Sequence, residues 1–431
     1  MNVGSDAVVT DDGGAPRSRP GPSRRWVTLM AVLGAASLAW TIASIWSDTW
    51  DAVQLDFAVY VLGAHHLVDG QLYHVGLPYR PFLPFTYPPV AALGFWPLAQ
   101  LSRQPAQAVW ALVNVASLFG IIALSLRAVR PGLDRTRLQL WSLVLLGPAV
   151  HLDPVRLNFY FGQINLVLCV LILADLTCTW TFRGRTLPRG VLLGVTAAVK
   201  LVPLVFVPYL FLTRQVRAAW TALATFVACS LLATAVDPSV SWAYWTRYAT
   251  DSSRVGNPSF ILNQSIQGAV DRLVHRQVSA LVVDILGAVV LVGGIALARW
   301  AWSQSSPFLG ILVCATTGML VSPITWEHHL VWAVPVLVWL ACAPDRPAGG
   351  WAWAAAGALV LWRAPLQHVP SGGTHELHEH GWTLLAGSSF FVLLVIYLVG
   401  VAVLLTVRRS RRTDRRVTDP SSPFASTGAT T

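Results

Sequence analysis

Twelve apolar stretches follow one another along the 431-residue chain, and most of its arginines lie on alternate connections between them. Apolar residues make up 55% of the sequence and charged residues only 12%, whereas a soluble domain carries roughly twice that charge. We therefore expect an all-α polytopic membrane protein with about 12 transmembrane helices. Ten of the stretches are clear: 26–46, 105–126, 138–152, 163–182, 218–236, 279–298, 307–322, 328–343, 351–362 and 383–407.

The arginines predict how the chain is oriented, because basic residues concentrate on the cytoplasmic side of a membrane. With the amino terminus placed inside, 21 of the 29 arginines fall on inner segments and eight on outer ones. Both termini are then expected in the cytoplasm, and the large outer loops 47–104, 237–278 and 363–382 are expected to carry the active site. The run 86–102 fits none of these crossings, so we interpret it as an interfacial or re-entrant helix that starts at Pro88-Pro89.

Three segments follow from this pattern: a disordered cytoplasmic tail at 1–25, a transmembrane domain at 26–407 and a basic cytoplasmic tail at 408–431. The net charge of +10 is explained by the inner arginines, so no nucleic-acid partner is expected. The five cysteines lie inside apolar stretches and lack the spacing of metal ligands. We therefore expect neither a disulfide framework nor a metal or other cofactor. From the apolar stretches we expect the protein in the plasma membrane.

The stretch 190–213 has arginines at both ends, so it must hold two half-length helices that meet at the outer side. Pro203 lacks a backbone donor and predicts the break. Lys200, the only lysine in the chain, lies at this break. A charge at the centre of a membrane costs about 2.5–3.5 kcal/mol on insertion scales. Lys200 could reduce that cost by extending to the outer interface, or it could contact a phosphate group.

The first outer loop contains a carboxylate between two apolar side chains. Asp56 follows Leu55 in a segment that could form a helix along the membrane surface. Apolar surroundings raise the pKa of a carboxyl group and suit it to act as a general base, although a solvated loop aspartate is the simpler interpretation. Arg80 and Tyr87 belong to an aromatic and proline-rich run in the same loop, which could equally be a turn that enters the membrane.

Further polar clusters lie at the outer ends of other stretches. Gln163 and Asn165 open one of them, and amide groups there should face protein or a cavity because lipid offers them no partner; bonding between helices is the alternative. Glu327-His328-His329 lies at the start of the apolar stretch 328–343. One imidazole there could donate to a phosphate or orient a carboxylate. Asn263 and Gln264 form part of a third polar segment. The tract 375–380 alternates His and Glu like a metal-binding sequence, but a titrating surface loop explains it as well.

An outer acidic residue, outward cationic groups and aromatic loops together suggest an enzyme that uses a lipid-linked sugar. A polyprenyl phosphate sugar carries a good leaving group, so its enzyme needs one base for the acceptor hydroxyl and positive charge beside the departing phosphate. Attack opposite the phosphate inverts the anomeric carbon.

Several short motifs in a fixed order also resemble a known family. They are Leu55-Asp56-Phe57, Phe85-Thr86-Tyr87-Pro88-Pro89, Gly162-Gln163-Ile164-Asn165, Lys200-Leu201-Val202-Pro203, Asn263-Gln264-Ser265 and Trp326-Glu327-His328-His329. Over 26–407 the chain resembles the mycobacterial polyprenol-phosphate-mannose-dependent mannosyltransferases of the C-type glycosyltransferase fold, and within them those that extend phosphatidylinositol mannosides through α-1,2 linkages.

The resemblance implies an inverting mannosyltransferase that works on the outer face of the membrane with a polyprenyl phosphate mannose donor and a glycolipid acceptor. It implies Asp56 as the base and His328 or His329 at the active site, with Lys200, Gln163, Asn165, Tyr87, Asn263, Gln264, Glu327 and Arg80 as candidate substrate contacts. Many enzymes of this fold have two adjacent acids in the first loop, whereas here Gln54 and Leu55 precede a single Asp, which favours a metal-independent mechanism. The alternatives are a lipomannan acceptor, an arabinosyl donor, or a transporter of lipid-linked glycans.

Overall fold

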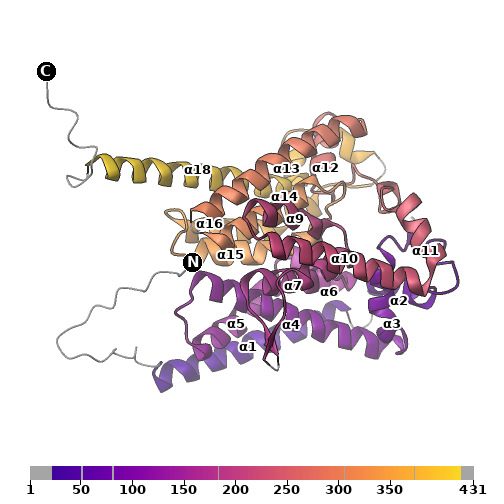
Figure 1. The fold of residues 1–431 in the computed structure, drawn as a ribbon, viewed down its shortest axis with the longest axis horizontal. Helices are drawn as coiled ribbons and strands as arrows, with labels where there is room; N and C mark the ends of the chain where they lie inside the picture. Colours follow the sequence, from indigo (N-terminus) through magenta and orange to yellow (C-terminus); the bar gives the residue numbers. More distant parts are fainter. Residues whose placement is uncertain are drawn as a thin grey trace.

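The computed structural model describes residues 22–49, 52–79, 82–182, 184–304, 306–372 and 374–418. Arg80 and most of the two predicted tails lie outside these residues. Helices dominate the described part, and Figure 1 shows the long ones lying side by side along the longest axis of the molecule. They include α1 (Arg24–Thr49), α4 (Arg103–Val129), α5 (Arg135–Val150), α10 (Val216–Val236), α13 (Ala280–Ser303) and α18 (Ser389–Thr418).

Five helices in the described ranges are long and apolar enough to cross a membrane: Arg24–Ser47, Arg103–Val129, Val216–Val236, Ala280–Ser303 and Ser389–Arg411. A sixth crossing arises if α5 and α6 (Asp153–Phe161), which meet at a bend of 80°, form one broken span. Shorter apolar helices cover other predicted crossings: α7 (Asn165–Thr177), α14 (Pro307–Val321), and η4 (Glu327–Trp332) with α15 (Ala333–Cys342). The predicted stretch 351–362 lies in α16 (Gly350–Arg363). The membrane character is therefore clear, while the count of twelve crossings and the side on which the termini lie stay predictions.

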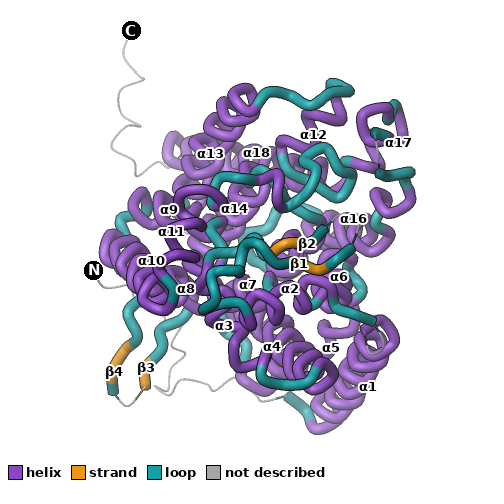
Figure 2. The backbone as a smooth tube through the Cα atoms, turned by 90° about the vertical axis from the view of Figure 1, so that its right-hand side faces the viewer, coloured by secondary structure: helices purple, strands orange, loops and turns teal. Residues whose placement is uncertain are grey.

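Short helices from separate loops lie together at one end of the bundle. Figure 1 shows α2 (Leu55–His65), α3 (Pro89–Ala99) and α11 (Pro238–Ala243) at the right, opposite the last turns of α18. Figure 2 looks onto this end, where β1 (Gly76–Leu77) pairs with β2 (Leu83–Pro84) beside α2 and α6. The helix expected in 86–102 is α3, which starts at Pro89. The loops 47–104 and 237–278 thus meet at the same end of the helices.

The stretch 190–213 is broken as the sequence predicts. Helix α8 (Val191–Val199) ends before Lys200, and a short turn, η1 (Val202–Val205), leads into α9 (Phe206–Leu212). Both α8 and α9 pack against α10. Lys200 itself is extended (φ −149°, ψ 128°), so its side chain leaves the helix at the break.

Two predicted stretches differ from the structure. Helix α7 ends at Thr177 rather than continuing to 182, because Cys178 is extended (φ −118°, ψ 161°) and the chain then forms a hairpin of β3 (Thr181–Phe182) and β4 (Arg185–Thr186). The indole of Trp180 donates to the Ala174 carbonyl in the last turn of α7. The stretch 383–407 contains a break at Ser388 between α17 (Gly381–Gly387) and α18. There the Gln264 amide donates to the Gly387 carbonyl and accepts from the Phe391 N–H.

An aromatic core fixes the position of α2. Phe57 and Tyr60 of α2 pack against Phe95 of α3, and Trp110 of α4 closes the same cluster. All four side chains are buried. Buried aromatic clusters hold helices in one orientation, so the packing of Phe57 and Tyr60 fixes the backbone of α2 that carries Asp56.

Candidate active site

Asp56 lies in the first turn of α2, outside the candidate membrane spans, and its side chain is partly exposed. Its Oδ2 accepts a hydrogen bond of 2.7 Å from Nε2 of Gln163. Burial raises the pKa of Asp56 from 3.8 to about 6, although the Gln163 hydrogen bond and the charge of Lys200 each lower it. A carboxylate with a pKa just below neutral is charged at pH 7 yet basic enough to accept a proton.

A left-handed glycine sets the position of Gln163. Helix α6 ends at Gly162 with φ 68°, and a Cβ at this position would lie 2.5 Å from Cβ of Phe57. The Trp110 indole donates to the Gly162 carbonyl at 2.8 Å, and the Gln163 N–H donates to the Asn158 carbonyl at 2.8 Å. Only glycine combines this backbone conformation with such a close approach. The Gln163 side chain therefore enters the site from a fixed backbone.

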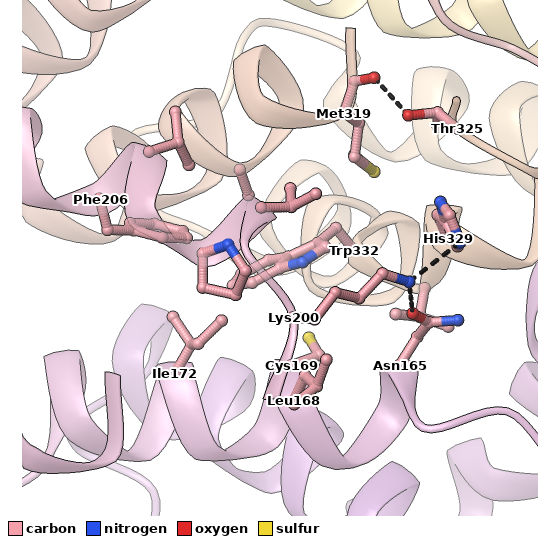
Figure 3. A pocket seen from close by; sticks show the side chains of 15 residues that line it. Asn165, Leu168, Cys169, Ile172, Lys200, Phe206, Met319, Thr325, His329 and Trp332 are labelled. Atoms are coloured by element: carbon pink, nitrogen blue, oxygen red, sulfur yellow. Dashed lines mark hydrogen bonds between the residues drawn. The ribbon is translucent and has the colours of Figure 1, made fainter. Parts of the chain in front are cut away.

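Lys200 reaches the same group of side chains from the break in 190–213. Its Nζ donates to Asn165 Oδ1 at 2.9 Å and lies 3.0 Å from Nε2 of His329. The same Nζ lies 5.5 Å from the centre of the Tyr87 ring, within the range of a cation–π contact. Figure 3 shows the lysine pointing toward Asn165 and His329. An ammonium group has three donors, so one is left after these two contacts.

An apolar cleft extends from these polar groups. Lys200, Asn165 and His329 supply polar groups to its lining. Leu168, Ile172, Phe206, Met319 and Trp332 supply much of the remaining lining (Figure 3). A cleft of this composition can hold an anionic group at the lysine and a hydrocarbon chain along the apolar wall.

The neighbouring histidines point to different partners. His329 faces Lys200, whereas the His328 ring meets the edge of Phe161 at 5.7 Å between centres and lies 3.9 Å from a carboxylate oxygen of Glu327. The backbone carbonyl of His328 accepts from Asn158 and Asn165 at 2.7 and 3.3 Å. Within the described residues, both ring nitrogens of His328 and Oε2 of Glu327 are buried without a hydrogen-bond partner. These three atoms can therefore make further contacts at the site.

The other candidate residues have different surroundings. Asn263 and Gln264 are fully buried, and their side chains bond to backbone groups: Asn263 to Pro258, Pro323, Ser265 and Thr325, and Gln264 to Ile261, Gly387 and Phe391. Both side chains therefore shape the loops rather than face the cleft. In the tract 375–380 the three histidines are exposed and the two glutamates are buried. No group of three metal-ligating side chains occurs among the described residues.

Two residues of the site were not singled out from the sequence. The Tyr60 hydroxyl donates to Gln163 Oε1 at 3.0 Å, and Asn158 binds the His328 carbonyl. Tyr60 follows Asp56 by four residues, so both lie on the same face of α2, and this spacing could have indicated it. Asn158 has no such signal, because its partner is 170 residues away.

The family described as "Glycosyltransferase family 87" matches residues 85–323, which include Gln163, Asn165 and Lys200. The chain belongs to glycosyltransferase family 87. No solved structure matches it.

Several relatives of this family 87 chain are named as mannosyltransferases, in agreement with the resemblance seen in its motifs. It is 34% identical over 425 residues to the polyprenol-phosphate-mannose-dependent alpha-(1-2)-phosphatidylinositol mannoside mannosyltransferase of Mycobacterium tuberculosis, covering 93% of this chain and 96% of the relative. The protein of the same name from Mycolicibacterium smegmatis is 34% identical, covering 86% and 89%. A pentamannoside mannosyltransferase of M. tuberculosis is 33% identical, covering 78% of each chain. The resemblance drawn from the motifs is thereby confirmed.

Proposed function

We propose that this family 87 enzyme transfers mannose from a polyprenyl phosphate mannose to a phosphatidylinositol mannoside, with formation of an α-1,2 linkage and inversion at the anomeric carbon. One observation carries the proposal: the carboxylate of Asp56 and the only lysine of the chain are joined through two amide side chains, beside an apolar cleft. The relatives named above suggest the donor and the linkage.

The donor fits the cleft by its chemistry. Its phosphate is placed at the free donor of Lys200, and its polyprenyl chain is placed along Leu168, Ile172 and Phe206. The ammonium group offsets the charge that the phosphate gains as it leaves, in a site that is largely shielded from water. His329 accepts from Lys200 through Nε2 and thereby directs the ammonium group.

Asp56 acts as the general base in this reaction. It removes the proton from the acceptor hydroxyl as that oxygen forms a bond to C1 of mannose. The bond between C1 and the phosphate oxygen breaks at the same time, and its electron pair leaves with the polyprenyl phosphate. Attack on the face opposite the phosphate converts a β-linked donor into an α-linked product.

The membrane face and the acceptor length belong to the proposal as well. The arginine distribution supports a site on the outer face of the plasma membrane. The relatives include proteins named for phosphatidylinositol mannoside and for its pentamannoside, so acceptor length is the property in which they differ. A transporter would need polar residues along a path through the membrane, whereas here the polar lining of the cleft gathers around Lys200.

The test is transfer of radiolabelled mannose from polyprenyl phosphate mannose to a panel of phosphatidylinositol mannosides of increasing length. We expect purified wild-type protein to label one of them through an α-1,2 linkage, and Asp56→Asn to label none. The matched control is Asp69→Asn, which changes an exposed aspartate of the same loop that pairs with His66. Failure of the wild type with every acceptor, or full activity of Asp56→Asn, would overturn the proposal.

A further inference from the structure

The amide of Gln163 connects the two charged ends of the site, and its side chain is 97% buried, with 3% exposed. Its Oε1 accepts from the Tyr60 hydroxyl at 3.0 Å and from Asn165 Nδ2 at 3.1 Å, while its Nε2 donates to Asp56. Both the oxygen and the nitrogen of the Gln163 amide therefore have protein partners in the described part of the chain.

The charges at the two ends decide which way each amide points. An ammonium group only donates, so Lys200 requires the oxygen of Asn165 on its side. The nitrogen of Asn165 then faces Gln163 and requires the Gln163 oxygen there. The nitrogen of Gln163 is left facing the carboxylate, which only accepts. A flip of either amide would set two donors or two acceptors against each other.

We propose that Gln163 is a positioning residue that holds Oδ2 of Asp56, keeps the carboxylate ionised in its buried surroundings and leaves Oδ1 for the acceptor hydroxyl. Among the described residues, Oδ1 of Asp56 has no hydrogen-bond partner. This inference rests on the proposed function, because it assigns the role of base to Asp56. It differs from the sequence-based expectation that Gln163 contacts the substrate.

The titration of Asp56 depends on the groups that face it. Gln163 and Lys200 favour the charged form, and burial opposes it. Tyr60, Tyr87 and Glu327 also lie within electrostatic range of the carboxyl group. The Gln163 bond is the only direct hydrogen bond among these influences. Its loss therefore raises the pKa of Asp56, so that more of the base is protonated at neutral pH.

The test compares Gln163→Met with the wild type in the pH dependence of kcat/KM. We expect the acid limb to move to higher pH by about one unit, with activity about fivefold lower at pH 6, about tenfold lower at pH 5 and close to wild type at pH 9. Gln54→Met is the matched control, because Gln54 is an equally buried glutamine that binds the Phe159 carbonyl and not Asp56. Its acid limb should stay at the wild-type pH.

A second readout does not need activity. The difference in melting temperature between wild type and Asp56→Asn, followed against pH, reports the titration of Asp56 in the folded protein. We expect its midpoint to move up by the same amount when both proteins carry Gln163→Met. Unchanged melting midpoints would overturn the role of Gln163 even if no acceptor is found. In the kinetic experiment, a raised KM for the donor with an unchanged acid limb would show that Gln163 is a substrate contact instead. If the wild type transfers no mannose but Gln163→Met still shifts the midpoint, only the proposed function is overturned.

Discussion

Nζ of Lys200 lies 3.0 Å from Nε2 of His329, although 129 residues separate them in the sequence. The contact joins the break after α8 to the turn η4, and it places the only lysine of the chain at the polar end of the cleft. An ammonium group donates in this contact, so the imidazole accepts through Nε2 and carries its proton on Nδ1.

Replacing Asp56 by Asn should abolish transfer without loss of stability. General-base catalysis contributes about 10²–10⁴-fold, so kcat should fall by at least two orders of magnitude. Because the folded pKa of about 6 exceeds the value of 3.8 for the free group, the charged carboxylate destabilises the fold above pH 6. The neutral amide should then raise the free energy of unfolding at pH 7.5 by on the order of 1 kcal/mol. Assays of kcat and melting temperature check both parts; a lower melting temperature would contradict the second.

The same pKa sets the pH dependence of the wild-type enzyme. Because Asp56 must be charged to accept a proton, kcat/KM should fall about tenfold per pH unit below pH 6 and level off above it. The folded protein binds a proton at Asp56 between pH 6 and 4 that the unfolded chain does not bind, so this group adds stability as the pH falls through that window. Losses of activity in that range would therefore reflect protonation of the base. Parallel melting curves separate this effect from unfolding.

Replacing Lys200 by Met should lower kcat by about 10²–10³-fold, since removal of one preformed electrostatic contact to a developing charge has an effect of that size. The acid limb should also move to higher pH, because the charge of Lys200 lowers the pKa of Asp56. Arg254→Met serves as a control, since Arg254 is a cation of the loop 237–278 that packs on Tyr248 and donates to the Tyr73 carbonyl. A pH profile of kcat/KM for the three proteins gives the result, and an unmoved limb in Lys200→Met would argue against coupling of the two charges.

Gly162→Ala should disrupt the site more than the same change at Gly184. Both glycines have left-handed backbones, with φ of 68° and 75°. A Cβ at 162 would meet Phe57 at 2.5 Å, whereas nothing lies within 4 Å of one at 184. We expect a loss of about 1 kcal/mol of unfolding free energy at 184 from backbone strain, and a larger loss with impaired activity at 162. Equal effects at both positions would show that the contact with Phe57 is unimportant.

Leu168→Trp should obstruct the cleft, because Leu168 is a buried part of its apolar lining. We expect a higher KM for a donor with a long polyprenyl chain and little change for a short-chain analogue. Kinetics with the two donors make the comparison. An equal rise in KM for both donors would show that the polyprenyl chain does not bind along this cleft.

The sequence predicts features that depend on neighbouring residues. The apolar stretches, the break at Lys200 and Pro203, and the burial of Gln163 and Asn165 follow from hydropathy, from the missing donor of proline and from the poor solvation of amides in lipid. Contacts between distant segments could not be predicted from the sequence. Asn263 and Gln264 were expected at the substrate, yet their partners in loops up to 127 residues away use their hydrogen bonds.

The break at Ser388 separates α17 from α18 in the carboxy-terminal part of the chain. Since the Gln264 side chain supplies hydrogen bonds on both sides of the break, helix α18 does not rely on α17 for a continuous ladder. Because segments joined in this way can open separately, we expect the amide protons of α17 to exchange with solvent while α18 stays folded.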